Sequence, residues 1–427
     1  MHMNDKKIKI VPRKRFPQFE SSEAWNELTL IQLSDRITDK VGTEKLTTLS
    51  ISAGVGFVTQ TEKFDRDISG NQYRNYIRIK KGDFSYNKGN SKKFPQGCIY
   101  ELNEYEEAAV PNAFISFRFH DDVVSDFYKG YFANNFHGKQ LRKHITSGAR
   151  SNGLLNINAD DFFNIVLPTP KETAEQQKIA DCIKCLDDLI GAENNKLNAL
   201  QKHKVGLMQK LFPTRNQDSP LYRFCEFGAS GSWKYVKLSD VADRVISKNR
   251  DNSIQRVFTN SAINGVIEQN KYFEREIVSE NNLSNYSIIE KGDYVYNPRI
   301  STVAPVGPIS KNKIGKGIIS PLYTVFRFRD DDYDFYEYYF KTTLWHQYIN
   351  GKSNMGARHD RITISTDDFM DMPIPMCPNI KEQERIALFF RGVDELIVKQ
   401  EQRVEELIRH KEGLLQQLFP SLEEVIK

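Results

Sequence analysis

The sequence lacks the features of a membrane protein and of a secreted, disulfide-bonded protein. Its 427 residues contain no run of 18 apolar residues, and the uncharged stretch 47–61 is rich in Thr, Ser and Gly, so we expect no transmembrane helix. The polar, basic N-terminus has no apolar segment of the kind that a secretory signal needs. Five cysteines are an odd number in a long chain, which favours a reducing compartment, the cytoplasm.

A large excess of charge of either sign is also missing. Lys and Arg number 60 against 56 Asp and Glu, which leaves a formal net charge of +4. This balance permits a local nucleic-acid-binding patch but does not indicate one. Apolar residues make up 39% of the chain and aromatic residues 11%, which is enough to form hydrophobic cores and excludes wholesale disorder. The length predicts two or three domains.

The chain is similar to itself when it is shifted by about 207 residues, which predicts a duplicated architecture. Lys-Gly-Asp, an aromatic residue, any residue and Tyr-Asn follow one another at 81–87 and again at 291–297. The closest match lies at the end of each half, where 175–213 and 382–420 share 16 of 39 residues without a gap. Each half therefore combines a divergent globular part with a more similar segment.

The similar segments are predicted to be two long helices that form a coiled coil. Thr173 with Gln176, and Asn379 with Glu382, have the spacing of a capping box at a helix start, and a proline follows the end of each segment. Apolar residues repeat between these signals with a period of seven, which is typical of a coiled-coil seam, although an ordinary core helix is the alternative. The predicted seam residues are Ile179, Ile183, Leu186, Ile190, Leu197, Leu200, Leu207, Leu211, Ile386, Phe390, Val393, Ile397, Val404, Leu407, Leu414 and Leu418.

The globular parts are predicted to have mixed α/β structure. Short β-rich runs lie on both sides of the Lys-Gly-Asp turns, and the aromatic segments 127–136 and 335–345 are predicted to be helical. If the long helices pair in antiparallel, a helix of about 37 residues gives a stem of roughly 55 Å with one globular part at each end. The predicted fold class is therefore α/β, with two mixed α/β domains separated by an antiparallel coiled coil of two long helices and related by a pseudo-two-fold internal repeat.

Four motifs, in the same order in both halves, resemble the specificity subunit of type I restriction-modification systems. They are the Phe-Pro-Gln-Phe…Trp opening, the Lys-Gly-Asp segments, Leu-Pro-Thr-Pro or Met-Pro-Ile-Pro before Glu-Gln-x-x-Ile-Ala, and the closing Leu-Phe-Pro. The second half departs from the pattern at 224–227, where Phe-Cys-Glu-Phe lacks the proline. The resemblance covers nearly the whole chain.

The resemblance implies an architecture and a set of partners. We expect a first target-recognition domain at 1–170, a first conserved helical region at 171–213, a second target-recognition domain at 214–377 and a second conserved helical region at 378–427. The two recognition domains would read the halves of a bipartite target in double-stranded DNA, and the helical spacer would set their separation. The helical regions would bind two methyltransferase (modification) subunits, and restriction (translocase) subunits would join that assembly. S-adenosylmethionine, ATP and Mg²⁺ would belong to those other subunits, so this chain is expected to hold no cofactor and to be no enzyme.

Motifs for catalysis are incomplete in the sequence. An amino-methyltransferase would need Asn or Asp followed by Pro-Pro and an aromatic residue, and the closest fragment is Asn-Pro-Arg at 297–299. The Gly-x-Gly at 54–56 lacks the third glycine of a dinucleotide loop, and 310–317 matches a phosphate-binding loop only at Gly-Lys. These gaps argue against a self-contained DNA modification enzyme, which stays an alternative at this point, as does a coiled-coil scaffold protein without a role on DNA.

Two pairs of side chains on the predicted helices are of residue types that can form chemical sites. Cys182 and Cys185 have the spacing of zinc ligands, but no second pair follows at ligand distance, so we expect no metal there. His203 and His410 occupy equivalent helix positions and are interpreted as structural or partner-facing residues rather than catalytic ones.

Basic and amide side chains in predicted loops are candidates for contacts with DNA. Such side chains read base edges, and basic ones position the phosphates. The Gly-Ala-Arg sequences at 148–150 and 356–358 stand out, because glycine lets a loop approach a groove while arginine offers two donors. The alternative for each residue is a solvated basic loop. The predicted DNA-binding residues are Lys88, Asn90, Lys92, Lys93, Arg142, Lys143, Arg150, Arg299, Lys313, Lys316, Arg358, His359 and Arg361.

Overall fold

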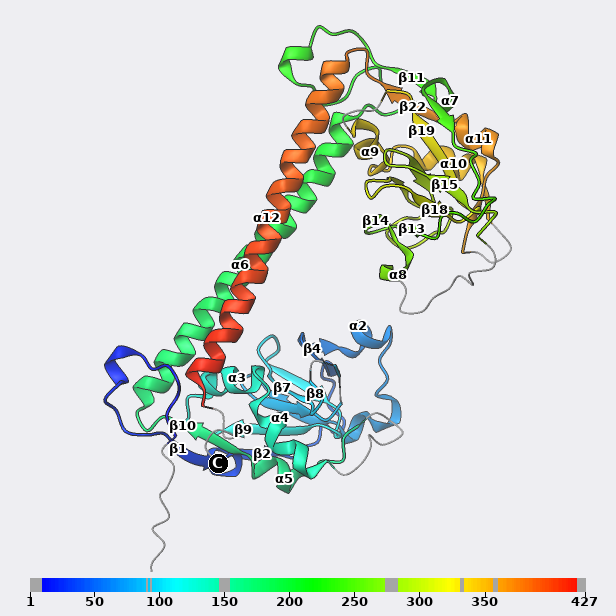
Figure 1. The fold of residues 1–427 in the computed structure, drawn as a ribbon. Helices are drawn as coiled ribbons and strands as arrows, with labels where there is room; N and C mark the ends of the chain where they lie inside the picture. Colours follow the sequence, from blue (N-terminus) through cyan, green and yellow to red (C-terminus); the bar gives the residue numbers. More distant parts are fainter. Residues whose placement is uncertain are drawn as a thin grey trace, which may run out of the picture. The chain divides into compact units, whose positions relative to one another are not determined.

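The chain divides into two compact units. The computed structural model describes residues 10–89, 91–92, 94–145, 154–272, 283–330, 334–355 and 360–420. Unit 1 comprises Met1–Asn194 and Arg403–Lys427, and unit 2 comprises Asn195–Gln402. Each unit contains a mixed α/β head and one half of each of two long helices, α6 (Thr173–Leu211) and α12 (Ile380–Leu418), drawn in green and in orange to red in Figure 1. The predicted mixed α/β class with two long helices is confirmed.

The head of unit 1 is built on a four-stranded antiparallel sheet in the order β2-β9-β6-β7. Its strands are β2 (Ser34–Ile37), β9 (Ile115–Phe119), β6 (Phe84–Asn87) and β7 (Cys98–Glu101). Three further antiparallel pairs are β1 (Asn26–Thr29) with β10 (Val166–Thr169), β3 (Leu49–Ser52) with β4 (Gly56–Thr59), and β5 (Ile77–Lys80) with β8 (Glu107–Val110). The helices are α1 (Leu30–Leu33), α2 (Gln60–Phe64), α3 (Ser125–Ala133), α4 (Phe136–Leu141) and α5 (Ala159–Phe163), with 3₁₀ turns at Pro17–Phe19, Gly70–Asn75 and Arg142–His144.

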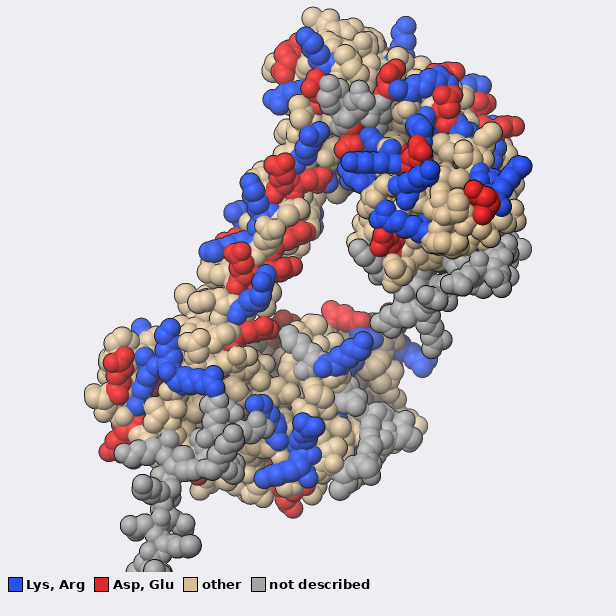
Figure 2. Space-filling model, in the orientation of Figure 1, with Lys and Arg blue, Asp and Glu red and all other residues tan. Residues whose placement is uncertain are grey.

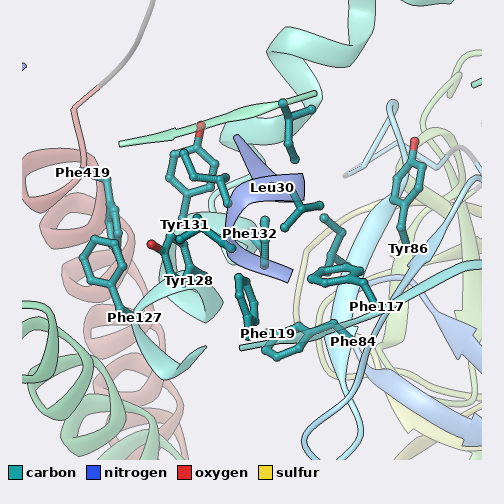
Figure 3. Close-up of a cluster of buried hydrophobic side chains, with 14 of the residues drawn as sticks. Leu30, Phe84, Tyr86, Phe117, Phe119, Phe127, Tyr128, Tyr131, Phe132 and Phe419 are labelled. Carbon is teal, nitrogen blue, oxygen red and sulfur yellow. The ribbon is translucent and has the colours of Figure 1, made fainter. Parts of the chain in front are cut away.

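The core of unit 1 is aromatic and reaches from the sheet to the end of α12. Phe84 of β6 stacks on Phe117 of β9 with ring centroids 5.5 Å apart. Phe419, which directly follows α12, contacts the ring of Phe127 in α3 at 5.0 Å and faces it in Figure 3. A side chain from the last residues of the chain therefore completes a core that the N-terminal part of the chain builds.

The head of unit 2 contains two four-stranded sheets. The antiparallel one, in the order β12-β19-β16-β17, consists of β12 (Ala242–Arg244), β19 (Thr324–Phe328), β16 (Tyr294–Tyr296) and β17 (Ile309–Lys311). The mixed one consists of β14 (Gly265–Glu268), β13 (Val257–Ser261), β18 (Gly317–Ile319) and β15 (Ser287–Ile289). Two antiparallel pairs are β11 (Lys234–Lys237) with β22 (Pro373–Met376) and β20 (Asn354–Met355) with β21 (Ile362–Thr363). The helices are α7 (Leu238–Val241), α8 (Gln269–Tyr272), α9 (Phe335–Phe340), α10 (His346–Lys352) and α11 (Thr366–Met370), with a 3₁₀ turn at Cys225–Phe227.

The core of unit 2 is also aromatic and is completed from a long helix. Tyr294 of β16 stacks on Phe326 of β19 at 5.5 Å. Phe212, which directly follows α6, contacts the ring of Phe335 in α9 at 5.2 Å. None of the helices in the described ranges of the chain combines the length and the apolar character that a membrane crossing requires.

The long helices pack against each other within each unit. In unit 1, Ile183 of α6 and Leu415 of α12 belong to the same buried cluster. In unit 2, Leu211 of α6 and Phe390 of α12 share a second cluster. In unit 1 the first part of α6 therefore lies near the last part of α12, and in unit 2 the last part of α6 lies near the first part of α12. All sixteen predicted seam residues are buried or half-buried, while most residues between them are exposed, as expected for a seam.

The capping boxes predicted at the starts of the two long helices are wrong for Gln176 and Glu382, but Asn379 does cap α12, where its side-chain oxygen accepts from the N–H of Lys381 at 3.0 Å. Helix α6 begins at Thr173 itself, and the side-chain amide of Gln176 donates to the carbonyl of Pro170 at 2.9 Å. At the start of α12, the carboxylate of Glu382 accepts from Arg223 instead of a helix N–H. Contacts outside the helices therefore occupy the side chains of Gln176 and Glu382, which local spacing had assigned to helix capping.

Two glycines inside the long helices are expected to be replaceable with a gain in stability. A Cβ added at Gly206 or Gly413 would meet no atom within 4 Å, so close packing does not require glycine there. Because glycine in a helix interior costs about 1 kcal/mol relative to alanine, Gly206→Ala and Gly413→Ala should each raise the free energy of unfolding by about that amount in urea denaturation. Gly130→Ala is the contrasting control. Its Cβ would lie 2.6 Å from Ile183 Cδ1, and it should lower stability.

Candidate nucleic-acid interface

Part of the predicted DNA-binding set can be placed in the structure. Both arginines of the Gly-Ala-Arg sequences fall outside the described residues, so their positions stay a prediction. The predicted residues outside the described ranges are Asn90, Lys93, Arg150, Arg358 and His359. The other eight belong to the two heads, four to each.

The head of unit 1 brings two distant segments together. Gly89 forms a β-bridge with Leu154, and the backbone N–H of Leu155 donates to the carbonyl of Lys88 at 2.9 Å. The segment that follows β6 therefore lies against the segment that follows Gly-Ala-Arg at 148–150. Lys88 is half-buried and its Nζ donates to the carbonyl of Ile157 at 3.3 Å, so it is a structural residue rather than a free contact.

Three further basic residues of unit 1 lie on the surface. Lys92 is exposed in the loop between β6 and β7. Arg142 and Lys143 are exposed in the 3₁₀ turn after α4, which leads towards 148–150 in the sequence. Their side chains are available to an external partner of opposite charge.

The head of unit 2 shows the same kind of pairing. Arg299 forms a β-bridge with Arg361, and the N–H of Ile362 donates to the carbonyl of Pro298 at 2.9 Å. Asp360 lies between the two guanidinium groups, 3.5 Å from Arg299 Nη2 and 3.9 Å from Arg361 Nε. These pairs are long and exposed, so they contribute little to stability and leave the arginines able to bind another anion.

The two remaining candidates of unit 2 lie in the turn between β17 and β18. Lys316 is exposed. Lys313 forms ion pairs with Glu337 at 2.6 Å and with Asp334 at 3.3 Å. Because two carboxylates already neutralise Lys313, it is a weaker candidate for phosphate binding than Lys316.

An asparagine shapes the paired loop of each head. The side-chain oxygen of Asn87 accepts from the N–H of Gly89 at 2.9 Å, and that of Asn297 accepts from the N–H of Arg299 at 3.0 Å. Such a bond from Asn to the backbone two residues later turns the chain. The Asn87 amide donates to Ile51 at 3.2 Å, so the turn is tied to the neighbouring hairpin. The sequence motif contains these asparagines but does not by itself predict this role.

Two glycines that the sequence reasoning missed make the same corner possible. Gly97 and Gly307 have φ of 85° and 80°, and a Cβ there would lie 2.4 Å and 2.1 Å from the carbonyl oxygens of Asn87 and Asn297. Tyr86 and Tyr296, which precede the asparagines, are buried, and each donates its hydroxyl to a backbone carbonyl in the same loop. The signal in the sequence is a glycine ten residues after each Tyr-Asn pair.

A buried arginine–glutamate pair fastens each head to a long helix. In unit 1, Arg15 Nε and Nη2 donate to the two carboxylate oxygens of Glu175, both at 2.6 Å. In unit 2, Arg223 makes the same two-pronged contact with Glu382, both at 2.7 Å. The carboxylates are almost fully buried, so these pairs fix the segment before each head against the first turn of a helix.

The lysines that interrupt the apolar seam have partners on the opposite helix. In unit 1, Lys411 of α12 donates to Asp187 of α6, and in unit 2, Lys204 of α6 donates to Asp394 of α12. The residue numbers of the two partners add up to the same total in both units. The helix halves therefore have the same antiparallel register in each unit, and the polar pairs are the kind of seam contact that specifies register.

Metal ligands do not gather in the described part of the chain. Those ranges contain no group of three or more His, Cys, Asp or Glu side chains that could hold a metal ion. Cys182 is half-buried and Cys185 is exposed on α6, and burial raises the pKa of Cys182. His203 and His410 are exposed on the long helices.

Charge on the surface is mixed. On the face that Figure 2 draws, basic and acidic side chains are interspersed along the two long helices and over both heads. A continuous basic surface would be expected of a protein that binds DNA through phosphates alone. The candidate interface consists instead of the paired loops and the exposed basic side chains beside them.

Part of the sequence matches the model of a protein family. Residues 53–202 match the model of the type I restriction modification DNA specificity domain. The match begins directly after β3. It includes the paired loops of unit 1 and most of α6.

Two curated relatives are specificity subunits. The type I restriction enzyme MjaVIII specificity subunit of Methanocaldococcus jannaschii is 26% identical over 322 residues, which covers 70% of each protein. The putative type I restriction enzyme MjaX specificity subunit of the same organism is 24% identical over 305 residues, which covers 69% of this chain and 68% of the relative.

Solved structures share the fold. A chain from a study of complex assembly and conformational transition of the type I R-M system matches with a TM-score of 0.57 and 17% identity, over 95% of this chain and 99% of that chain. The S subunit of a type I restriction-modification system from M. genitalium matches with a TM-score of 0.50 and 13% identity, over 96% and 99% of the two chains. At such low identity, these likenesses bear on the fold alone.

Proposed function

We propose that the chain belongs to the specificity subunits of type I restriction-modification systems and that its two heads read the two halves of a bipartite target in double-stranded DNA. A specificity subunit selects the DNA sequence and is not itself an enzyme. This membership decides against a self-contained modification enzyme and against a scaffold without a role on DNA. We propose the recognition domains at 1–170 and 214–377, and the helical regions at 171–213 and 378–427.

One observation carries the assignment of the reading surface. Each head uses backbone hydrogen bonds to hold a basic loop after a Tyr-Asn strand against a second, distant segment, at Lys88 with Leu155 and at Pro298 with Ile362. Phosphate contacts carry no sequence information, so reading base edges requires side chains on a fixed backbone. The asparagine turns and buried tyrosines supply that rigidity. Exposed Arg142, Lys143, Lys316 and the Arg299–Arg361 pair then supply donors.

The long helices support the proposed spacer. We infer an antiparallel coiled coil in which α6 and α12 set the distance between the half-sites, with the two halves of the chain related by a pseudo-two-fold repeat. The support is the buried seam, the common register of the Lys–Asp pairs and the equal length of both helices at 39 residues.

The partners follow from the same proposal. The helical regions would bind two methyltransferase (modification) subunits, and restriction (translocase) subunits would join through that complex. The cofactors of methylation and translocation would then belong to those partners. All five cysteines are free thiols, which agrees with action in the cytoplasm.

The test is whether single arginines control one half-site each. Arg142→Ala in unit 1 and Arg299→Ala in unit 2 should each lower discrimination at one half-site by about 1–3 kcal/mol and leave the other half-site unchanged. We make the same prediction for Arg358→Ala. Methylation by the complete assembly, on DNA with single-base changes in either half-site, measures this.

A control separates loss of base reading from loss of general charge. Arg409 is exposed on α12 at the stem, and Arg409→Ala should leave both half-sites unaffected. Equal discrimination by the wild type and the variants at both half-sites would remove these arginines from the interface. An assembly whose target did not change when the chain was exchanged for another specificity subunit would contradict the function itself.

A further inference from the structure

Unit 1 contains a cavity of about 390 Å³ where its head meets the two long helices. Gly130 of α3 lines this cavity together with Phe132, and Ile183 and Asp187 of α6 form another part of the lining. Lys411 of α12 donates to Asp187, so an ion pair forms one wall. The cavity therefore combines apolar surface with a carboxylate acceptor, as small-molecule sites commonly do.

Helix α9 of unit 2 resembles α3 of unit 1 in sequence but has a different residue at the position of Gly130. Residues 127–132 read Phe-Tyr-Lys-Gly-Tyr-Phe and residues 335–340 read Phe-Tyr-Glu-Tyr-Tyr-Phe, so the two segments differ at only two of six positions. One of these differences places Tyr338 where unit 1 has Gly130. The Tyr338 side chain is buried, with 5% of its surface exposed.

The contacts of Tyr338 define a site for a phenol ring. Its hydroxyl donates to Asp394 Oδ2 at 3.0 Å, and its ring packs on that of Phe390 with centroids 5.1 Å apart. The Nζ of Lys204 lies 5.7 Å from the ring centroid and also donates to Asp394. A carboxylate acceptor, an apolar wall and a cation near the ring thus hold the phenol.

The cavity of unit 1 is lined by the counterparts of these three residues. A shift of 207 positions relates Phe390 to Ile183, Asp394 to Asp187, and Lys204 to Lys411. The Lys–Asp ion pair is also preserved between them. Unit 1 therefore has the walls of the tyrosine site but no tyrosine on α3 to fill it.

Position 130 cannot supply the ring by a simple substitution. A Cβ on Gly130 would lie 2.6 Å from Ile183 Cδ1 and 2.9 Å from Phe419 Cε2. Phe419 is a ring buried in the core of unit 1 and cannot move away without a cost in packing, even where Ile183 Cδ1 turns into the cavity. A ring that occupies the cavity has to come from a second molecule.

We propose that this cavity is a binding site for a para-alkyl phenol, the group that a tyrosine side chain carries. The hydroxyl donates to Asp187, the ring packs against Ile183, and the ammonium group of Lys411 lies near the ring, where a cation attracts an aromatic face. The site is separate from the reading of DNA and does not depend on it. Its ligand is either a free small phenol or the tyrosine of a partner chain, which share this chemistry.

The experiment titrates p-cresol into the full-length chain and measures heat of binding by calorimetry. We expect one site with a Kd on the order of 1 mM or tighter, as the small number of ligand atoms allows. Asp187→Ala should weaken binding roughly tenfold, because the hydroxyl loses a charged acceptor. Asp188→Ala, an exposed neighbour on the same helix, should not change the Kd. Toluene, which has no hydroxyl, should bind less tightly than p-cresol.

A second variant tests the site without disturbing unit 1. Tyr338→Gly empties the tyrosine site of unit 2 and should lower the melting temperature. p-Cresol should then bind this variant at two sites and restore part of the lost melting temperature. N-acetyltyrosinamide distinguishes the sources. If it binds as p-cresol does, the site takes a tyrosine of a partner chain, and if only p-cresol binds, it takes a free phenol. No binding of p-cresol to the wild type, or a Kd that Asp187→Ala leaves unchanged, would overturn the proposal.

Discussion

Replacing Glu382 by alanine is expected to lower the free energy of unfolding of unit 2 by about 3–5 kcal/mol. The Glu382 side chain is fully buried and that of Arg223 is 13% exposed, so the variant would leave a guanidinium group in the interior without its counter-charge. Cys377 also donates its thiol to Glu382 at 3.2 Å, and this contact would be lost as well. The large expected effect comes from the stranded charge rather than from the strength of the pair itself.

Urea denaturation measures the loss in the free energy of unfolding, and hydrogen exchange shows where in unit 2 it occurs. Exchange should rise first in the opening turns of α12, where Glu382 lies. Glu395→Ala, at an exposed position on the same helix, is the control and should change stability by less than about 0.5 kcal/mol. The double variant Arg223→Met, Glu382→Leu should recover most of the loss, because it removes both charges. A loss below about 1 kcal/mol for Glu382→Ala would contradict the buried-pair interpretation.

The regular parts of this fold could be predicted from the sequence because their signals are local. The seven-residue apolar period and the prolines at 213 and 420 located both long helices, which end two residues before these prolines. The β-rich runs beside the Lys-Gly-Asp turns located β5 and β6 in unit 1 and β15 and β16 in unit 2 in the same way. Each of these signals lies within the element that it predicts.

Contacts between distant segments could not be predicted in this way. Arg15 and Glu175 are 160 residues apart, and only the fold shows that the glutamate of the Glu-Gln motif binds an arginine. The hydrogen bond between Leu155 and Lys88 also joins distant segments, and no local pattern in the sequence predicts it. The predicted DNA-binding residues were chosen only because they lie in expected loops, and their contacts with DNA stay a prediction. The sequence has no means of separating Lys313, held by two carboxylates, from exposed Lys316.

Acid is expected to destabilise unit 1 through His137 of α4. The side chain is fully buried, with its ring 5.7 Å from that of Phe132 and 6.2 Å from that of Tyr86. Burial, opposed in part by the backbone of Gly97, lowers the pKa of His137 from 6.5 to about 3. The unfolded chain therefore binds a proton below about pH 6.5 that the folded chain does not bind until about pH 3. Stability contributed by the neutral ring is complete above pH 6.5 and is lost as the pH falls through this window.

The expected loss at about pH 5 is about 2 kcal/mol relative to about pH 8. Urea denaturation of the wild type and of His137→Leu at both pH values isolates this contribution, because carboxylates elsewhere titrate alike in the two proteins. The wild type should lose about 2 kcal/mol more than His137→Leu. His410→Leu, at an exposed position on α12, should follow the wild type. Equal losses of stability by His137→Leu and the wild type between the two pH values would contradict this prediction. His137 would then have to accept a proton in the folded protein, and the buried neutral ring would not be the source of acid sensitivity.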